Sequence, residues 1–178
     1  MPSNHSRAGS PCPPPSGSAA MWLNLSTVSA TSTEVQTTVS MDRLPAGNSF
    51  LTVAGRAVGT SGYVARVRVA TDGAVQLHVG RGISSVTALA GGVVDGLMLV
   101  PGEKLRVRVQ VTGTSPTTVR AKVWRDGDAE PATWRATAND STADLQVAGG
   151  VALQAYVGGA AGSPDVLVAW DDLWAGQP

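Results

Sequence analysis

Few side chains in this chain could do chemistry, and the two histidines come first because histidine is the commonest general base in enzymes. His5 lies near the start of the chain, and His78 lies in AVQLHVG, where apolar residues alternate with it. That alternation places His78 on the solvent side of a strand. With Cys12 as the single cysteine, no zinc cluster can be assembled. A Ser-His-Asp triad would depend on His78, and no G-x-S-x-G nucleophile elbow is present. The sequence therefore predicts no catalytic site.

Acidic residues gather in two places. RDGDAEP carries Asp126, Asp128 and Glu130; it resembles a calcium loop in composition but lacks the other EF-hand ligands, so a solvated turn is favoured. In VLVAWDDLWAG, Asp171 and Asp172 interrupt an alternating pattern, which predicts a β-bulge. The Glu-x-Asp-x-x-Glu strand motif of retaining glycosidases is absent, which disfavours that activity.

Trp124 is the aromatic residue best placed to meet a ligand. It falls on the polar side of its strand with Arg120 and Lys122, and Asp126 follows it. Sugars stack their apolar C–H faces on aromatic rings and leave their hydroxyls to polar neighbours. These four residues therefore form a predicted ligand site. Alternatively, the RDGDAEP loop covers the ring, or the ring caps the core.

Basic side chains also alternate with apolar ones on three expected strands. The positions are Arg66 and Arg68 on one strand, and Arg106, Arg108, Arg120 and Lys122 on two others. If these strands share one sheet, they form a basic stripe that can meet an anionic glycan or a neighbouring subunit. Pairing with exposed acids explains the pattern equally well.

The elements that must position these residues are strands. In KLRVRVQVTGTSPTTVRAKV, apolar and polar residues alternate on both sides of a GTSP turn, which is typical of a β-hairpin. The same pattern, separated by turn signals, predicts strands at 21–29, 34–43, 50–58, 62–70, 74–80, 85–89, 104–112, 117–125, 132–138, 150–157 and 166–174. Regular strands without interleaved helices favour an all-β, antiparallel two-sheet sandwich of about ten strands.

Length and composition limit the alternatives. The 178 residues suit a single domain, and 13 basic residues balance 13 acidic ones, so nothing indicates nucleic-acid or membrane-surface binding. Residues 1–20 are rich in Pro, Ser and Gly and predict a disordered leader before a sandwich at 21–178. No apolar run is long enough to cross a membrane, and the start of the chain lacks the apolar section of a secretion signal.

Several segments together resemble a known type of module. GYVARVRVATDGAVQL, LRVRVQVTGTSPTTVRAKVWRDGDAEPATW, GGVALQAYVGG and VAWDDLWAG are similar to the jelly-roll modules of the concanavalin A-like, laminin-G-like type, found in secreted actinobacterial proteins and actinophage minor tail proteins. The resemblance covers roughly residues 23–176. Such modules usually begin with further strands containing a Trp-Gly element, and this chain departs from them there.

The resemblance implies a jelly-roll sandwich and a recognition or structural role rather than a reaction. It also implies that Asp171 or Asp172 holds a structural calcium ion; no other cofactor is expected. We expect a non-enzymatic module, extracellular or in a virion tail, that binds cell-envelope carbohydrate and neighbouring subunits. The alternatives are a purely structural domain without a ligand and an accessory domain of a glycan-degrading enzyme.

Overall fold

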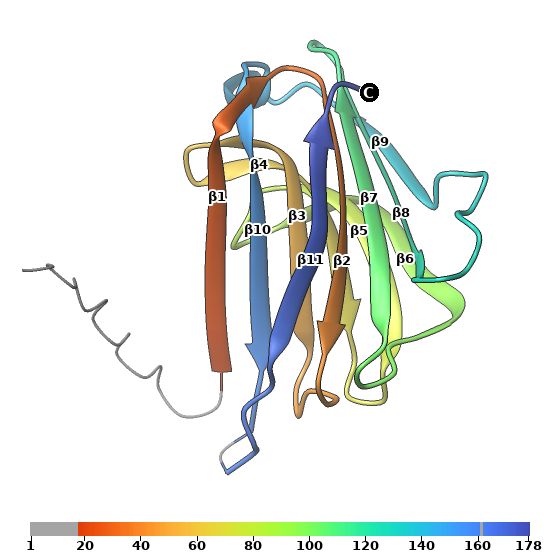
Figure 1. Ribbon diagram of the computed structural model, residues 1–178. Helices are drawn as coiled ribbons and strands as arrows, with labels where there is room; N and C mark the ends of the chain where they lie inside the picture. The colour runs from red at the N-terminus through yellow and green to blue at the C-terminus, as the bar shows by residue number, and fades with distance from the viewer. Residues whose placement is uncertain (1–17, 161) are drawn as a thin grey trace, which may run out of the picture.

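The computed structural model describes residues 18–160 and 162–178, and within them the protein is a sandwich of two antiparallel sheets (Figure 1). The strands are β1 (Ser18–Ala30), β2 (Thr33–Met41), β3 (Ser49–Val58), β4 (Ser61–Val69), β5 (Ala74–Arg81), β6 (Thr87–Met98), β7 (Lys104–Thr112), β8 (Thr117–Arg125), β9 (Ala136–Asp140), β10 (Gly149–Gly158) and β11 (Val168–Gly176). One short 3₁₀-helix, η1 (Ala143–Leu145), precedes β10. The predicted all-β jelly-roll class is confirmed.

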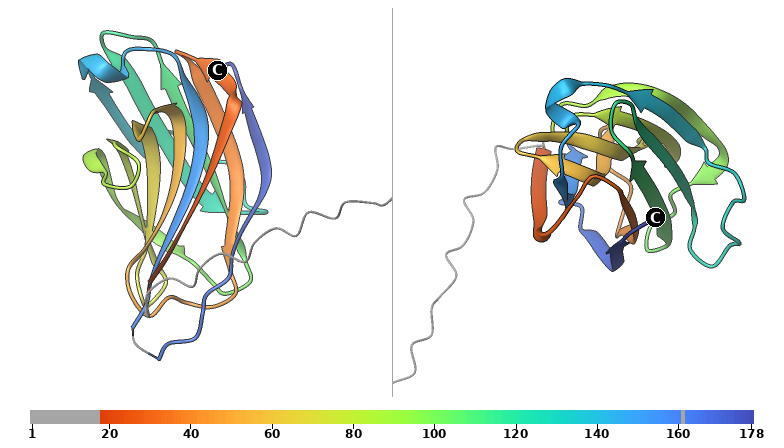
Figure 2. Two further views of the ribbon diagram at one scale, coloured as in Figure 1. Left: turned by 90° about the vertical axis from the view of Figure 1, so that its left-hand side faces the viewer. Right: turned by 90° about the horizontal axis from the view of Figure 1, so that it is seen from above.

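The strand order places sequence-distant strands side by side. The six-stranded sheet runs β1-β10-β3-β4-β5-β6, and the five-stranded sheet runs β11-β2-β7-β8-β9. Figure 2 shows the two layers from the side and from above, lying face to face. The C-terminus lies at the end of the sandwich opposite the start of β1 (Figure 1).

Period-two alternation fills the space between the sheets. On β7 the buried apolar residues are Leu105, Val107, Val109 and Val111, and the polar residues between them face outward. Valines from both sheets dominate this core, since a β-branched side chain fits the surface of a pleated strand well. None of the helices in the described ranges is long and apolar enough to span a membrane.

The clearest differences from the predicted strands are in β1, β6 and β9, and β9 begins at Ala136 rather than at 132. The strand expected at 85–89 is β6, which continues to Met98 through a glycine-containing segment with register shifts against β5. β1 already begins at Ser18, so it includes Ser18, Ala19 and Ala20 from the expected leader. The rest of that leader, with His5 and Cys12, lies outside the described residues.

A fully buried arginine closes one end of the sandwich. The register shifts between Ala54 and Arg56 of β3, and the Arg56 guanidinium donates hydrogen bonds to Thr117 Oγ1 (2.8 Å), to the carbonyl of Leu145 (3.0 Å) and to that of Gly113 (2.7 Å). It also donates to the carbonyl of Thr31. Arg56 therefore joins the β1–β2 turn, the β7–β8 turn and η1, and none of the described carboxylates pairs with it.

Candidate functional site

The outer face of the five-stranded sheet carries the predicted ligand site. Arg106 of β7 lies opposite Trp124 of β8, Arg108 opposite Lys122, and Gln110 opposite Arg120. β4, with its two outward arginines, lies in the other sheet. The three strands therefore do not share one sheet, and the basic stripe that depended on this condition does not extend over all of them. Alternation could not show this, because sheet membership depends on strand order.

Acidic partners neutralise most cations of this face. The ion pairs are Arg106–Asp126 (2.7 Å), Arg108–Glu130 (2.7 Å), Lys122–Glu130 (2.6 Å), Lys104–Asp171 (2.8 Å), Arg125–Glu103 (3.1 Å) and Arg108–Glu34. Arg120 donates from Nε to Gln110 Oε1 (2.7 Å) and, like Lys122, lies over the ring of Trp134, 4.6 and 4.8 Å from its centroid. These side chains are thus engaged with one another, and Lys122 is buried.

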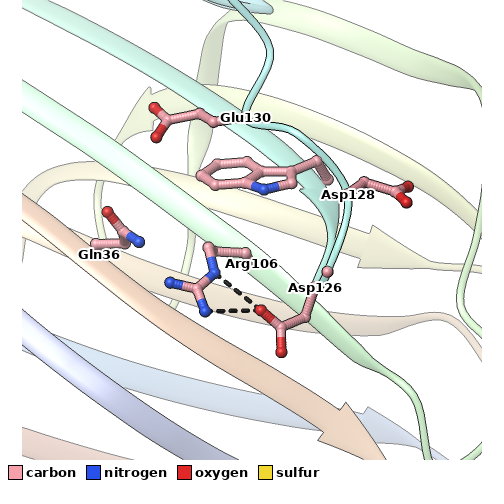
Figure 3. A pocket seen from close by; sticks show the side chains of 7 residues that line it. Gln36, Arg106, Asp126, Asp128 and Glu130 are labelled. Carbon is pink, nitrogen blue, oxygen red and sulfur yellow. Dashed lines mark hydrogen bonds and ion pairs between the residues drawn. The ribbon is translucent and has the colours of Figure 1, made fainter.

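Trp124 lines an open hollow of about 400 Å³ at the edge of this network. Its other lining residues are Gln36, Arg106, Asp126, Gly127, Asp128 and Glu130, and Figure 3 shows Arg106 directed at Asp126, with Gln36, Asp128 and Glu130 around the space. The Trp124 side chain is only 6% exposed. A ring so deeply covered offers a sugar little area for stacking, which favours the interpretation that the following loop covers it. Ligand binding by these residues stays a prediction.

Asp171 and Asp172 form the predicted bulge. The pairing of β11 with β2 shifts register between Asp171 and Trp174, and Asp172 has a φ of 50°. Lys104 donates to Asp171 Oδ2 at 2.8 Å, which holds the pKa of that carboxyl below its usual range, and the Asp172 amide donates to Oδ1 at 2.9 Å.

These surroundings do not fit a calcium site. Ca²⁺ takes six to eight oxygen ligands, usually including several carboxylates, whereas an ammonium group already occupies Asp171. Among the described residues no three His, Cys, Asp or Glu side chains are grouped to hold a metal ion. Lys104 thus pairs with one of the two acids of the bulge, and calcium binding stays a prediction.

A second face of different character lies on the outside of the six-stranded sheet. The pairing registers align two rows across β10, β3, β4 and β5: Tyr156, Phe50, Arg68 and Gln76 in the first row, and Gln154, Thr52, Arg66 and His78 in the second. The residues between them, such as Leu51, Val67 and Leu77, point into the core. We name the outward set of Phe50, Arg66, Arg68, Gln76, His78, Gln154 and Tyr156 the basic aromatic face.

Aromatic rings and a guanidinium pack against one another there. Phe50 and Tyr156 have ring centroids 6.0 Å apart, and the Arg66 guanidinium carbon lies 5.0 Å from the Phe50 centroid. Phe50 is half-buried and Tyr156 is 37% exposed. The two rings thus form a fixed apolar surface that solvent reaches.

The loop 82–86 forms a wall beside these rows. Ile83 packs into a small second apolar cluster with Ala54, Val64 and Ala152, on the outside of the sheet. The loop turns at Gly82, where φ is +94° and a Cβ would lie 2.1 Å from the carbonyl oxygen of Ser85, so glycine is required.

Arg66 and Gln154 fasten this wall to the sheet. Arg66 Nη2 donates to the carbonyls of Ile83 and Ser84 at 3.0 and 3.1 Å, and Gln154 Nε2 donates to Ser84 Oγ at 3.1 Å. The wall is therefore held by side chains that belong to the second row of the face.

His78 completes the face as a neutral group. Burial lowers the pKa of His78, and the positive charges of Arg68 and Arg66 lower it further. An imidazole with a pKa below 6.5 is uncharged at pH 7. His78 therefore offers one hydrogen-bond donor and one acceptor there, rather than a charge.

Alternation alone predicts that Arg66, Arg68 and His78 point outward. No local pattern indicated that Tyr156 and Phe50 would join them, because β10 follows β3 by about a hundred residues and their proximity depends on the strand order. The one usable hint was the scarcity of aromatic residues, because it limited the number of rings that could form a stacking surface.

The two sheets and their order define the chain as a jelly-roll β-sandwich. No protein-family model matches the sequence, and no curated protein matches it. Among solved structures, it is similar to the carbohydrate-binding module CBM66 from Bacillus subtilis, with a TM-score of 0.56 and 13% identity over 90% of this chain and 83% of that one. It is also similar to the CBM2 module of the evolved Dit of Lactobacillus casei BL23 phage J-1, with a TM-score of 0.52 and 9% identity over 88% and 67%. At such identities the likeness shows the fold alone.

Proposed function

We propose that the protein is a carbohydrate-binding module without catalytic activity, and that its ligand lies on the basic aromatic face. The observation that carries this proposal is the row Tyr156, Phe50, Arg68 and Gln76, which places two rings beside a cation and an amide. Aromatic rings take the C–H faces of sugars, and adjacent polar groups take the hydroxyls.

The row also has a suitable size and rigidity. Strands in a sheet are about 4.8 Å apart, so Tyr156 and Gln76 are separated by roughly 14 Å across three strand spacings. Side chains on a sheet are held by their neighbours, which limits the conformational entropy that binding must overcome. Such a surface suits an extended polymer better than a small molecule.

Two further considerations support binding rather than catalysis. The two similar solved structures described above are both carbohydrate-binding modules, one of them from a phage Dit. The basic aromatic face itself contains no Asp or Glu, whereas most glycosidases need a pair of carboxyl groups beside the scissile bond.

The wider setting is part of the same proposal. A module that recognises cell-envelope carbohydrate serves either a phage tail or a secreted surface protein, and its other partners are neighbouring subunits of that assembly. An accessory domain of a glycan-degrading enzyme uses the same face in the same way. A purely structural domain uses no ligand at all, so a binding measurement separates it from the others.

The test is retention on a panel of immobilised bacterial wall polysaccharides and plant and animal glycans. We expect the protein to be retained by part of the panel and Tyr156→Ala to bind about tenfold more weakly, as loss of an aromatic contact worth roughly 1 kcal/mol or more implies. Trp174→Ala is the matched control, because it removes an aromatic residue that is 50% exposed on β11 of the other sheet.

Three results would contradict the proposal. A folded protein silent across the panel indicates a structural domain. Binding that survives Tyr156→Ala but is lost in Asp126→Asn moves the site to the hollow beside Trp124. Shortening of a bound polysaccharide, measured by size-exclusion chromatography, would show an enzyme.

A further inference from the structure

The charge of the basic aromatic face is unusual for this protein. On the five-stranded sheet the outward cations other than Arg120 have carboxylate partners, whereas neither Arg66 nor Arg68 has one among the described residues. Both arginines are half-buried on β4. A positive charge that is partly removed from water and left without a counter-ion attracts an anionic ligand more strongly than a paired one does.

The two arginines differ in how many hydrogen bonds they already donate within the protein. Arg66 donates to two loop carbonyls and, from Nε, to Thr52 Oγ1 at 3.4 Å, and it also lies over Phe50. Within the described part of the chain, Arg68 donates one hydrogen bond, from Nη2 to Asn48 Oδ1 at 2.9 Å. A guanidinium has five N–H donors in a planar fork, so Arg68 has donors left for a ligand, while Arg66 holds the wall.

The position of Arg68 relative to the rings indicates where the anionic group would sit. Arg68 lies directly opposite Phe50 in the pairing of β4 with β3, one strand spacing of about 4.8 Å away. An anionic group attached to the same sugar ring that stacks on the platform would reach the guanidinium. Arginine binds carboxylate with two parallel hydrogen bonds, which adds direction to the attraction.

We propose that the ligand of this face is a polysaccharide whose sugar rings carry carboxylate groups, with Arg68 as the carboxylate contact and Phe50 and Tyr156 as the stacking surface. This inference rests on the proposed carbohydrate-binding function and names its ligand class. Gln76, opposite Arg68, and the neutral His78 supply hydrogen bonds to hydroxyl groups.

The experiment measures affinity for polygalacturonate, polyglucuronate and hyaluronan, and for the same polymers after methyl esterification of their carboxyl groups. We expect the esters to bind at least about tenfold more weakly, because a hydrogen bond to a charged group contributes more than a neutral one. Arg68→Gln should weaken binding of the acids by about tenfold and leave the weak binding of the esters unchanged. Added salt should reduce affinity for the acids only.

Arg125→Gln is the matched control. It removes one positive charge at the end of β8, in the five-stranded sheet, where Arg125 pairs with Glu103. Affinity for the acids should therefore stay at the wild-type value. Melting temperatures of both variants confirm that they are folded.

Each remaining outcome decides a separate point. Equal binding of acids and esters overturns the carboxylate assignment and leaves carbohydrate binding intact. Equal losses in Arg68→Gln and Arg125→Gln show general charge attraction and overturn the site. Binding of a polyol phosphate, included as a further arm, without binding of any polyuronate shows that the anion is phosphate. If the protein binds none of the acid, ester and phosphate polymers and none of the glycans of the wider panel, the proposed function itself is overturned.

Discussion

His78 lies beside Arg66 and Arg68 on the basic aromatic face, and that face includes no carboxylate and no second histidine. It lies opposite Arg66 on β4 and opposite Gly91 on β6, so no side chain stands directly across from it on β6. Burial and the two neighbouring arginines lower its pKa. The imidazole of His78 is therefore protonated at a higher pH in the unfolded chain than in the folded protein.

The first prediction follows from that difference. Between pH 7 and pH 5 the unfolded state binds more protons at His78, so the free energy of unfolding should fall as the pH falls below about 6.5. In His78→Gln this part of the pH dependence should disappear, as measured by urea unfolding at several pH values. NMR titration should give a midpoint below 6.5 that rises when an anionic polymer is bound. An unchanged pH profile in His78→Gln would contradict the assignment.

The second prediction concerns Trp124, which the structure buries. Trp124→Ala should lower the free energy of unfolding by roughly 3 to 5 kcal/mol, as truncation of a buried aromatic residue does. Trp174→Ala, at a half-exposed position, should change it by no more than about 0.5 kcal/mol. Chemical denaturation measures both. Equal and small losses would mean that Trp124 is open to a ligand after all.

The third prediction concerns Arg56, whose guanidinium joins three segments at one end of the sandwich. Arg56→Met should keep much of the side-chain volume but leave the carbonyls of Thr31, Gly113 and Leu145 without this donor. Since an unpaired buried polar group costs about 1–3 kcal/mol, we expect destabilisation above about 3 kcal/mol in thermal or urea unfolding. Arg43→Met, at an exposed ion pair, is the control and should be nearly neutral.

Residue positions were predictable to the extent that local alternation determines them. Arg106, Arg108, Arg120 and Lys122 do point outward from one sheet. Arg56 could not be predicted, because a register shift in β3 turns it inward, and alternation assumes that no such shift occurs.

At the scale of the element, β11 shows how a bulge can resemble a metal site in sequence. The two consecutive acids occur where the strand departs from regular pairing with β2. Thr37 Oγ1 donates to the carbonyl of Asp171 at 2.9 Å, which satisfies a backbone acceptor in the bulge. The carboxylate and the carbonyl of Asp171 therefore both have partners within the protein.

The fourth prediction tests the calcium expectation directly. A ligand that binds only the folded state raises the melting temperature with its concentration, and because Lys104 occupies Asp171, we expect identical melting curves in millimolar calcium and in chelator. A rise with calcium that Asp171→Ala or Asp172→Ala abolishes would instead establish the site.

Most strands were predictable because each buries one side, which fixes a period of two. β6 was the exception in extent, since its glycines, Gly91, Gly92 and Gly96, weaken the strand pattern. Sheet membership was not predictable, because it is set by which strands pair, and partners such as β1 and β10 are far apart in the chain.

At the scale of the whole molecule, the outer faces of the two sheets differ in how their cations are paired, and the overall composition does not reveal this difference. Thirteen basic and thirteen acidic residues give no net charge. The five-stranded sheet nevertheless carries mostly neutralised pairs, and the six-stranded sheet carries Arg66 and Arg68 without carboxylate partners among the described residues.

The two arginines that have no described carboxylate partner give the outer face of the six-stranded sheet a local positive field. Such a field does not draw the protein toward an anionic surface from a distance as a net charge would, but it orients the molecule during the last stage of diffusion. The six-stranded sheet would then arrive first, and a larger share of encounters would be productive. The orienting effect should fade once the Debye length, about 10 Å at 0.1 M salt, becomes shorter than the molecule.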